Sequence, residues 1–178
     1  MPGQAPLRRT DEGLVPDGDG WFVLNATEAR WREDGPFGFY TPFAGDVRFP
    51  QVGVSIAVLE PGQPNCMYHR EDDQENFLVL SGECLLIVEG QKRRLRRWDF
   101  VHCPPGTDHV FVGDGDEPCT LLLIGARSPD AGIVYPRSDA ALEHEAGVEE
   151  ETTSAEEAYR PYPEPTFTPY RKGWLPGD

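Results

Sequence analysis

Two short stretches of the sequence carry imidazole and carboxylate side chains at spacings that could build a metal site. The first, residues 61–83, holds His69, Glu71 and Glu75, and the second, residues 96–113, holds His109 after a Pro-Pro-Gly turn. Two imidazoles with one or two carboxylates and no thiolate suit Fe(II), Mn(II), Ni(II) or Zn(II). The sequence therefore contains the donor set of a divalent-metal site.

Strand geometry can bring these side chains together. Side chains two residues apart on a strand share a face, so Met67, His69 and Glu71 would point together into a barrel that this strand lines. A turn through residues 72–74 returns the chain, and Glu75 opens the next strand, so His69 and Glu75 could meet across two adjacent strands. The Pro-Pro-Gly turn sets a tight corner, after which His109 opens a strand and can be a third inward ligand.

Several neighbouring side chains have roles that the sequence leaves open. Glu71 lies in the acidic run REDDQE, so it could be a fourth ligand, a general acid or base, or part of a solvated turn. Tyr68 is a second candidate acid or base, with a surface role as the alternative, and His102 is expected to be a hydrogen-bonded structural residue. Substrate contacts are expected from apolar side chains that line the barrel mouth, namely Met67, Phe77, Val79, Phe111 and Leu86.

The elements that would position these residues are short strands. Between Trp21 and Arg127, short runs rich in β-branched and aromatic residues alternate with Pro and Gly, and no long segment has a helical period. Examples are WFVL at residues 21–24, VGVSIAVL at 52–59 and CLLIVEG at 84–90. Evenly spaced strands of this kind are typical of a sandwich or a barrel. The length of 178 residues suits one domain with extensions.

The two stretches together resemble the paired motifs of the cupin superfamily. The second half of the first cupin motif, a Glu followed by six residues and a Gly, is matched by Glu75 and Gly82. The Pro-x-Gly-x-x-His of the second motif is matched by Pro104, Gly106 and His109. Both motifs occur in the right order, so the combination is far more specific than one short pattern.

The sequence departs from these motifs at three places. Counting back three residues from Glu75, His69 is the first His of the His-x-His pair, and Glu71 replaces the second. Gly62 is followed by six residues before His69, where the family has five. Trp98 replaces the Gly that usually opens the second motif, and Gly113 replaces its Asn. These departures leave the fold assignment intact but put a full four-ligand set in doubt.

The resemblance implies an all-β fold, a double-stranded β-helix or jelly-roll barrel, with one divalent metal ion on His69, Glu75 and His109. Such a three-ligand set would leave positions open for water, substrate or O₂. Cupins use these sites in dioxygenases, decarboxylases and isomerases, and also in non-enzymatic binders. Two functions therefore stay open: a metal-dependent enzyme on a small polar organic substrate, or a non-catalytic sensor or storage module that binds a small molecule.

The rest of the sequence forms extensions around a barrel at residues 21–127. Residues 1–20 are dense in Gly, Pro and Asp, and we expect a flexible tail there. Residues 128–178 form an acidic extension in which Ser154 and Glu157 make a capping-box pattern for one short helix through Ala158. Its Pro-rich part is expected to be extended. The extension could be disordered, but we favour packing across its own or a partner subunit's barrel because it carries several aromatics: Tyr159, Tyr162, Phe167, Tyr170 and Trp174.

Composition restricts the partners. A net charge of −15 argues against binding to nucleic acid and to an anionic membrane surface. No apolar h-region follows Met1 and the apolar runs are short, so we expect a cytoplasmic protein. The four cysteines lie far apart and are expected to be small, mostly buried thiols. The basic run at residues 91–97 is expected on the solvent face of an edge strand, and the need to cover strand edges predicts a homodimer.

Overall fold

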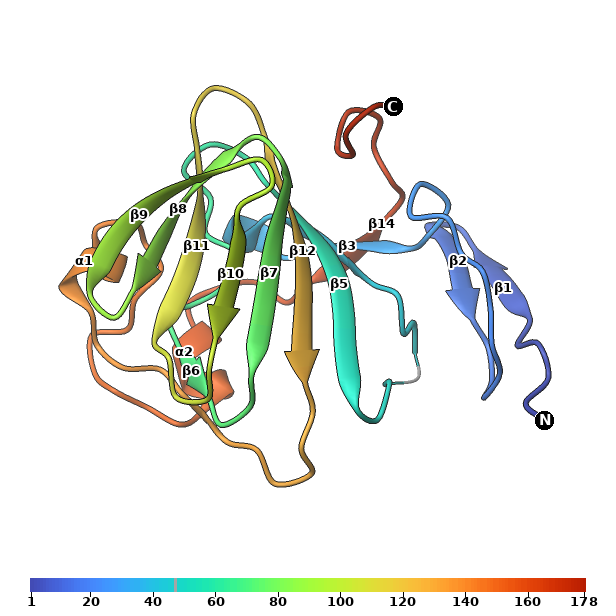
Figure 1. Cartoon of the computed structure of the whole chain (residues 1–178), viewed down its shortest axis with the longest axis horizontal. Helices are drawn as coiled ribbons and strands as arrows, with labels where there is room; N and C mark the ends of the chain where they lie inside the picture. Colours follow the sequence, from blue (N-terminus) through green and yellow to red (C-terminus); the bar gives the residue numbers. More distant parts are fainter. Residues whose placement is uncertain (47) are drawn as a thin grey trace.

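Two antiparallel sheets form the body of the molecule (Figure 1). The structure is a computed structural model that describes residues 1–46 and 48–178. The larger sheet contains, in spatial order, β10 (Phe100–Cys103), β7 (Glu75–Ser81), β12 (Cys119–Ala126), β5 (Val52–Leu59), β4 (Phe39–Pro42), β3 (Trp31–Glu33) and β14 (Thr166–Thr168). The smaller sheet contains β11 (His109–Asp114), β8 (Glu83–Val88) and β9 (Gln91–Arg96). The all-β fold predicted from the sequence is therefore confirmed.

The two sheets enclose one apolar core because alternate side chains on each strand point inward. The larger sheet contributes inward residues such as Phe77 and Leu121, and the smaller sheet contributes residues such as Leu86 and Phe111. All four side chains are almost fully buried. This core forms the floor on which the candidate site lies.

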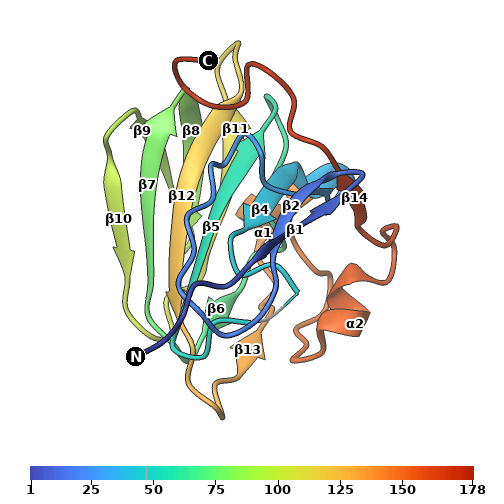
Figure 2. The ribbon, with the colours of Figure 1, turned by 90° about the vertical axis from the view of Figure 1, so that its right-hand side faces the viewer.

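The C-terminal extension packs against its own barrel, as the aromatic side chains predicted. Tyr170 and Trp174 pack with Trp31 on the outer face of the large sheet. Tyr159 and Tyr162 pack edge-on against Phe37, which lies in the 3₁₀ turn η1 (Gly35–Phe37). Figure 2 shows β14 and α2 (Ala155–Tyr159), two elements of the extension, on the side of the molecule opposite β10. Phe167 differs, being 51% exposed beneath the Arg30 guanidinium.

The local structure of the extension follows its capping residues. The Ser154 hydroxyl accepts a hydrogen bond from the Glu157 backbone N–H at the start of α2, so the predicted helix and its N-cap are confirmed. The reciprocal bond of a capping box is not made, because the Ser154 N–H donates to Thr152 Oγ1 instead. A second short helix, α1 (Asp139–Leu142), is capped in the same way by Ser138 and was not expected. The Pro-rich segment is extended and enters the sheet only as its last strand, β14, where missing backbone donors are tolerated.

The N-terminal segment is more regular than its composition indicated. Residues expected to be an irregular tail form a hairpin of β1 (Leu7–Thr10) and β2 (Gly13–Pro16). Backbone hydrogen bonds join Leu14 to residues 28 and 30, and Val15 is buried. Conversely, the run at residues 21–24 expected to be a strand forms only a bridge at Trp21, and the first strand of the large sheet begins at Trp31. Both differences arise from contacts between segments that a local pattern does not reveal.

The strand edges and remaining features agree with several sequence expectations. The basic run forms β9, an exposed edge strand, and Lys92 pairs with Glu143 of the acidic extension. At the β10 edge, the apolar side chains of Trp98 and Phe100 are exposed, and a second copy of the chain could cover them. The homodimer stays a prediction. All four cysteines are free thiols, three of them buried. None of the described helices is long and apolar enough to cross a membrane.

Candidate metal centre

The two histidines of the predicted site are held opposite each other by backbone pairing. The His69 N–H donates to the His109 carbonyl over 3.1 Å, and the His109 N–H donates back to the His69 carbonyl over 2.8 Å. His109 is the first residue of β11, and His69 immediately precedes the short strand β6 (Arg70–Glu71), which pairs with β13 (Ile133–Val134). Opposed residues of an antiparallel pair share a face. The two rings accordingly lie 4.9 Å apart, centroid to centroid.

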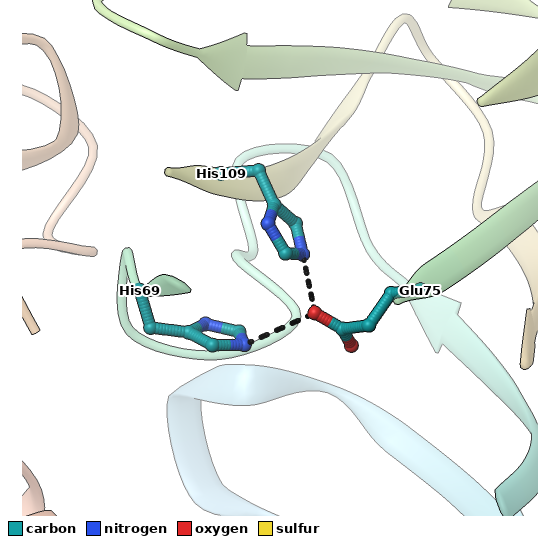
Figure 3. Close-up of side chains that lie close together, drawn as sticks. All are labelled: His69, Glu75 and His109. Carbon is teal, nitrogen blue, oxygen red and sulfur yellow. Dashed lines mark ion pairs between the residues drawn. The ribbon is translucent and has the colours of Figure 1, made fainter. Parts of the chain in front are cut away.

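Glu75 reaches the two rings from the other sheet. It is the first residue of β7, on the same inward face as Phe77 two residues later. Its Oε2 atom lies 3.3 Å from His109 Nε2 and 3.8 Å from His69 Nε2 (Figure 3). The three residues form a group of donor atoms within 4.8 Å of one another that could hold a metal ion.

Backbone carbonyls fix which nitrogen of each ring can act as a ligand. The Nδ1 of His69 lies 2.8 Å from the Met67 carbonyl, and the Nδ1 of His109 lies 3.0 Å from the Thr107 carbonyl. A carbonyl can only accept, so Nδ1 carries the hydrogen in both rings and each Nε2 has a free lone pair. The Cys66 thiol makes a longer contact of 3.6 Å with His69 Nδ1. Donation from the second ring nitrogen is the usual support for a metal-binding histidine.

The buried environment keeps the donors uncharged in the absence of a cation. Burial lowers the pKa of His69 to about 4, helped by the neighbouring His109, and burial also lowers the pKa of His109. Burial raises the pKa of Glu75 to about 8, with further contributions from Glu71 and Asp73. The contacts drawn as dashed lines in Figure 3 are therefore not charged pairs at neutral pH.

One atom of the group has no hydrogen-bond partner at all. Among the residues that the structure describes, His109 Nε2 is the sole buried side-chain nitrogen or oxygen in this condition. Leaving a buried polar atom unsatisfied costs about 1–3 kcal/mol, so such an atom needs an explanation. A divalent ion accepts lone pairs from imidazole nitrogen and carboxylate oxygen alike. The donor set, the tautomers and the orphaned nitrogen all fit such an ion.

The apolar residues predicted to line the barrel mouth lie in the core beneath the group. The Phe77 ring is 5.2 Å from the His109 ring and 4.5 Å from the Phe111 ring. Val79 and Leu86 lie deeper in the same core. These four side chains thus support the ligands from below. The fifth, Met67, packs beneath the C-terminal extension with Phe37 and Tyr135 instead.

Tyr68 does not approach the donor atoms. It alternates away from His69 and packs in a separate apolar cluster with Ile87 and Val110, on the outer side of the small sheet. Its hydroxyl oxygen lies 3.4 Å from the Gly90 backbone N–H. The acid or base role expected for Tyr68 therefore finds no support in its position, because adjacent strand residues face opposite sides. His102 is an exposed residue that hydrogen-bonds Asn76, in agreement with its expected structural role.

Glu71 lies beside the donor group but outside it. It lines the same cavity as Glu75, yet it is not among the donors that come within 4.8 Å of one another. Burial raises the pKa of Glu71, Asp73 raises it further, and Arg48 and Arg127 oppose the shift. A half-buried carboxyl group at a cavity wall suits an acid or base better than a fourth ligand.

The sequence reasoning missed one aromatic neighbour of the group. The Tyr135 ring lies 6.0 Å from the His69 ring, and burial raises the pKa of its hydroxyl to about 12. Tyr135 is placed by backbone pairing with Thr152, within the C-terminal extension. No motif marks this tyrosine, because its position depends on how the extension folds back onto the barrel.

A cavity of about 360 Å³ opens on the other side of Glu75. Its walls come from the inner face of β3, β4, β5, β7 and β12, from β6, and from the segments that flank β5 and β12. Charged and polar side chains dominate these walls: Arg32, Tyr40, Arg48, Ser55, Glu71, Glu75 and Arg127. The sequence-based site included none of the three arginines or Tyr40, since these residues lie outside the two motifs, on β3, on β4 and in the segments that flank β5 and β12.

Residues 55–125 match the family model described as the cupin domain. The barrel is a cupin domain. Its metal-site candidates are accordingly the His69 and Glu75 of the first cupin motif and the His109 of the second. A three-residue group that could hold a metal is present in this cupin domain, and the jelly-roll fold expected from the resemblance is shown.

The chain is also similar to solved structures and to a curated protein. A putative sugar phosphate isomerase from Acidithiobacillus ferrooxidans is 28% identical, with a TM-score of 0.51 over 57% of this chain and 67% of that one. A cupin-superfamily sugar phosphate isomerase from Silicibacter pomeroyi is 20% identical, with a TM-score of 0.49 over 84% and 85%. An uncharacterized protein of Methanocaldococcus jannaschii is 22% identical over 69 residues. The match covers 39% of this chain and 55% of that relative, so this chain spans about half of the relative's length.

Proposed function

We propose that this cupin is a metal-dependent enzyme acting on a small polar organic substrate, with one divalent ion held by His69, Glu75 and His109. The observation that carries this proposal is the convergence of two buried imidazoles and a partly buried carboxyl group, with His109 Nε2 unsatisfied, beside a polar cavity. A closed structural ion would need no such cavity, whereas catalysis requires room for a substrate next to the donors.

The residues of the chain divide the work as follows. His69, Glu75 and His109 would hold a divalent ion, which supplies Lewis-acid polarisation of a substrate oxygen. The Met67 and Thr107 carbonyls keep the rings in the ligating tautomer. The core aromatics beneath His109 exclude water from below. Glu71, at the cavity wall, is the candidate to accept or return a proton, provided that the substrate comes within hydrogen-bond reach.

Among the reaction types open to such a site, we favour isomerisation. The Acidithiobacillus structure is named a putative sugar phosphate isomerase, and it is 28% identical over 57% of this chain. Isomerisation by proton transfer between neighbouring carbons needs a carboxyl or imidazole base next to a polarised carbonyl. A carboxyl group beside, but outside, the donor group meets that need, and Glu71 is in that position.

The proposal is tested with protein stripped by a chelator and reloaded separately with Fe(II), Mn(II), Ni(II) or Zn(II). Each form is incubated with aldose and ketose phosphates and with hydroxy acids, and products are followed by NMR. We expect turnover with at least one metal, reduced by about 100-fold or more in Glu75→Gln. Glu83→Gln, an exposed carboxyl on β8, is the matched control and should keep full activity. Tight ligand binding without turnover under any metal would instead favour the non-catalytic binder.

A further inference from the structure

The inner face of the large sheet is hollow next to Glu75 because two glycines lie in its row. Glu75 pairs with Gly125 on β12, and Gly125 pairs with Gly53 on β5. Paired residues of neighbouring antiparallel strands project on the same face, so this row has a carboxylate at one end and no side chains beyond it. Strands lie about 4.8 Å apart, which puts Gly53 about 10 Å from Glu75. A small molecule can occupy this space.

Arg127 closes the far end of the hollow. A β-carbon at Gly53 would come within 2.8 Å of Arg127 Nη2 and 2.9 Å of its Nε, so the guanidinium lies directly over this glycine. The Nη1 atom donates a hydrogen bond to the Phe49 carbonyl over 2.8 Å, which fixes the side chain. Within residues 1–46 and 48–178, the Nη2 and Nε atoms make no side-chain hydrogen bond. A planar fork of donors thus faces the cavity with part of its capacity unused.

Two more arginines share the cavity. Arg48 lies near Arg127, and the pKa of Arg127 is lowered by burial and then by the charge of Arg48. Arg32 pairs with Tyr40 across β3 and β4, and its guanidinium lies 5.0 Å from the centre of the Tyr40 ring. Within the described residues, none of the three has a carboxylate oxygen within 4.0 Å. Six arginines elsewhere do have one: Arg8, Arg30, Arg70, Arg94, Arg137 and Arg171.

Other surface arginines in the described part of the chain also lack a carboxylate partner, but these three line one cavity, in a chain that has 31 Asp and Glu against 16 Lys and Arg. Like charges placed together repel, and of the two carboxyl groups of the cavity Glu75 is assigned to the metal. Glu71 interacts with the charges of Arg48 and Arg127, but none of its oxygens lies within 4.0 Å of their guanidinium nitrogens, so it leaves their donors unused. An anion between Arg127 and Arg48 would relieve the repulsion and use the free donors. Arginine forks match the oxygens of phosphate and carboxylate groups in a bidentate manner.

We propose that this cavity binds an oxyanion group of the substrate, a phosphate or a carboxylate, through Arg127 and Arg48, with Arg32 and Tyr40 on the adjoining wall. The rest of the substrate then extends along the glycine row toward Glu75. The assignment of the anion to the substrate rests on the proposed function. Binding of an anion by the arginines does not require the metal. The negative charge of the whole chain limits the ligand to a small molecule.

The experiment is a calorimetric titration of the full chain with inorganic phosphate and, separately, with malonate, at constant ionic strength. We expect saturable binding of at least one anion, weakened about tenfold or more in Arg48→Gln and in Arg127→Gln. Arg93→Gln, which removes the same charge from exposed strand β9, is the matched control and should bind as the wild type does. The preferred anion tells a phosphate ligand from a carboxylate ligand.

Two further variants separate this inference from the metal proposal. Arg127→Lys keeps the charge but loses the fork, so it should bind the anion more weakly than the wild type while keeping its melting temperature. His109→Ala, titrated without metal, should keep the anion site. If neither anion saturates the wild type, or if Arg48→Gln and Arg127→Lys bind both anions as the wild type does, the inference is overturned, whatever the metal content. If anion binding survives while no metal is found, only the proposed function fails.

Discussion

The two sides of Glu75 are built in opposite ways. On one side lie His69 and His109, which are 8% and 1% exposed, locked by backbone carbonyls and supported by core aromatics. On the other side lie two glycines and a cavity whose charged walls come from six strands and their flanking segments. The difference places the ligand side in the buried core, and we expect the cavity side to tolerate substitution without loss of the barrel.

The largest expected effect tests whether the ligand side is truly part of the core. Phe77→Ala removes the ring beneath His109 and leaves a cavity between the two sheets. We expect a loss of about 3–5 kcal/mol in the free energy of unfolding, measured by urea denaturation. Arg48→Gln on the cavity side should change it by less than about 0.5 kcal/mol. Equal losses in the two variants would remove the distinction between the two sides.

The same division explains what could be predicted from the sequence. The ligand side is encoded locally, because Glu75 to Gly82 and Pro104 to His109 are short segments with characteristic turns and spacings. Short apolar runs bounded by Pro and Gly likewise predict strands such as β5 and β8. The capping-box pattern at Ser154 is a local signal as well, and the helix it predicts is present.

The parts that escaped prediction depend on distant contacts. Arg32, Arg48 and Arg127 are scattered through the sequence and meet only because β3, β5 and β12 belong to one sheet. Tyr135 reaches His69 only because the C-terminal extension folds back onto the barrel. Tyr68 is a different case, because the alternation that puts Met67, His69 and Glu71 on one face already turns Tyr68 to the other, where it packs with Ile87 and Val110.

The pH dependence of metal affinity tests whether Glu75, on the ligand side, binds the metal. In the metal-free protein the pKa of Glu75 is raised to about 8, so at lower pH a metal must displace its proton. The pKa of His69 is lowered to about 4, so this ring does not compete above pH 5. Affinity should therefore rise about tenfold per pH unit from pH 5 to 8 and level off above pH 8. An affinity independent of pH over this range would refute the assignment of Glu75.

A smaller effect on metal binding is expected for Glu71, which belongs to the cavity side. Glu71→Gln keeps the shape of the side chain and removes its charge. Because Glu71 lies outside the donor group, metal affinity should change by no more than about threefold, while any turnover should be lost if this carboxyl is the base. A large loss of metal affinity would make Glu71 a fourth ligand. No change in either quantity would leave it as part of a surface turn.

The most direct test of the account is the metal content of the protein purified without added metal. Elemental analysis should find about one divalent ion per chain in the wild type and almost none in His109→Ala, which lacks the nitrogen left unsatisfied in the buried group. His102→Ala, which removes an exposed histidine on β10, should keep the full content. Equal metal content in the wild type and His109→Ala would contradict the assignment of the metal to His69, Glu75 and His109.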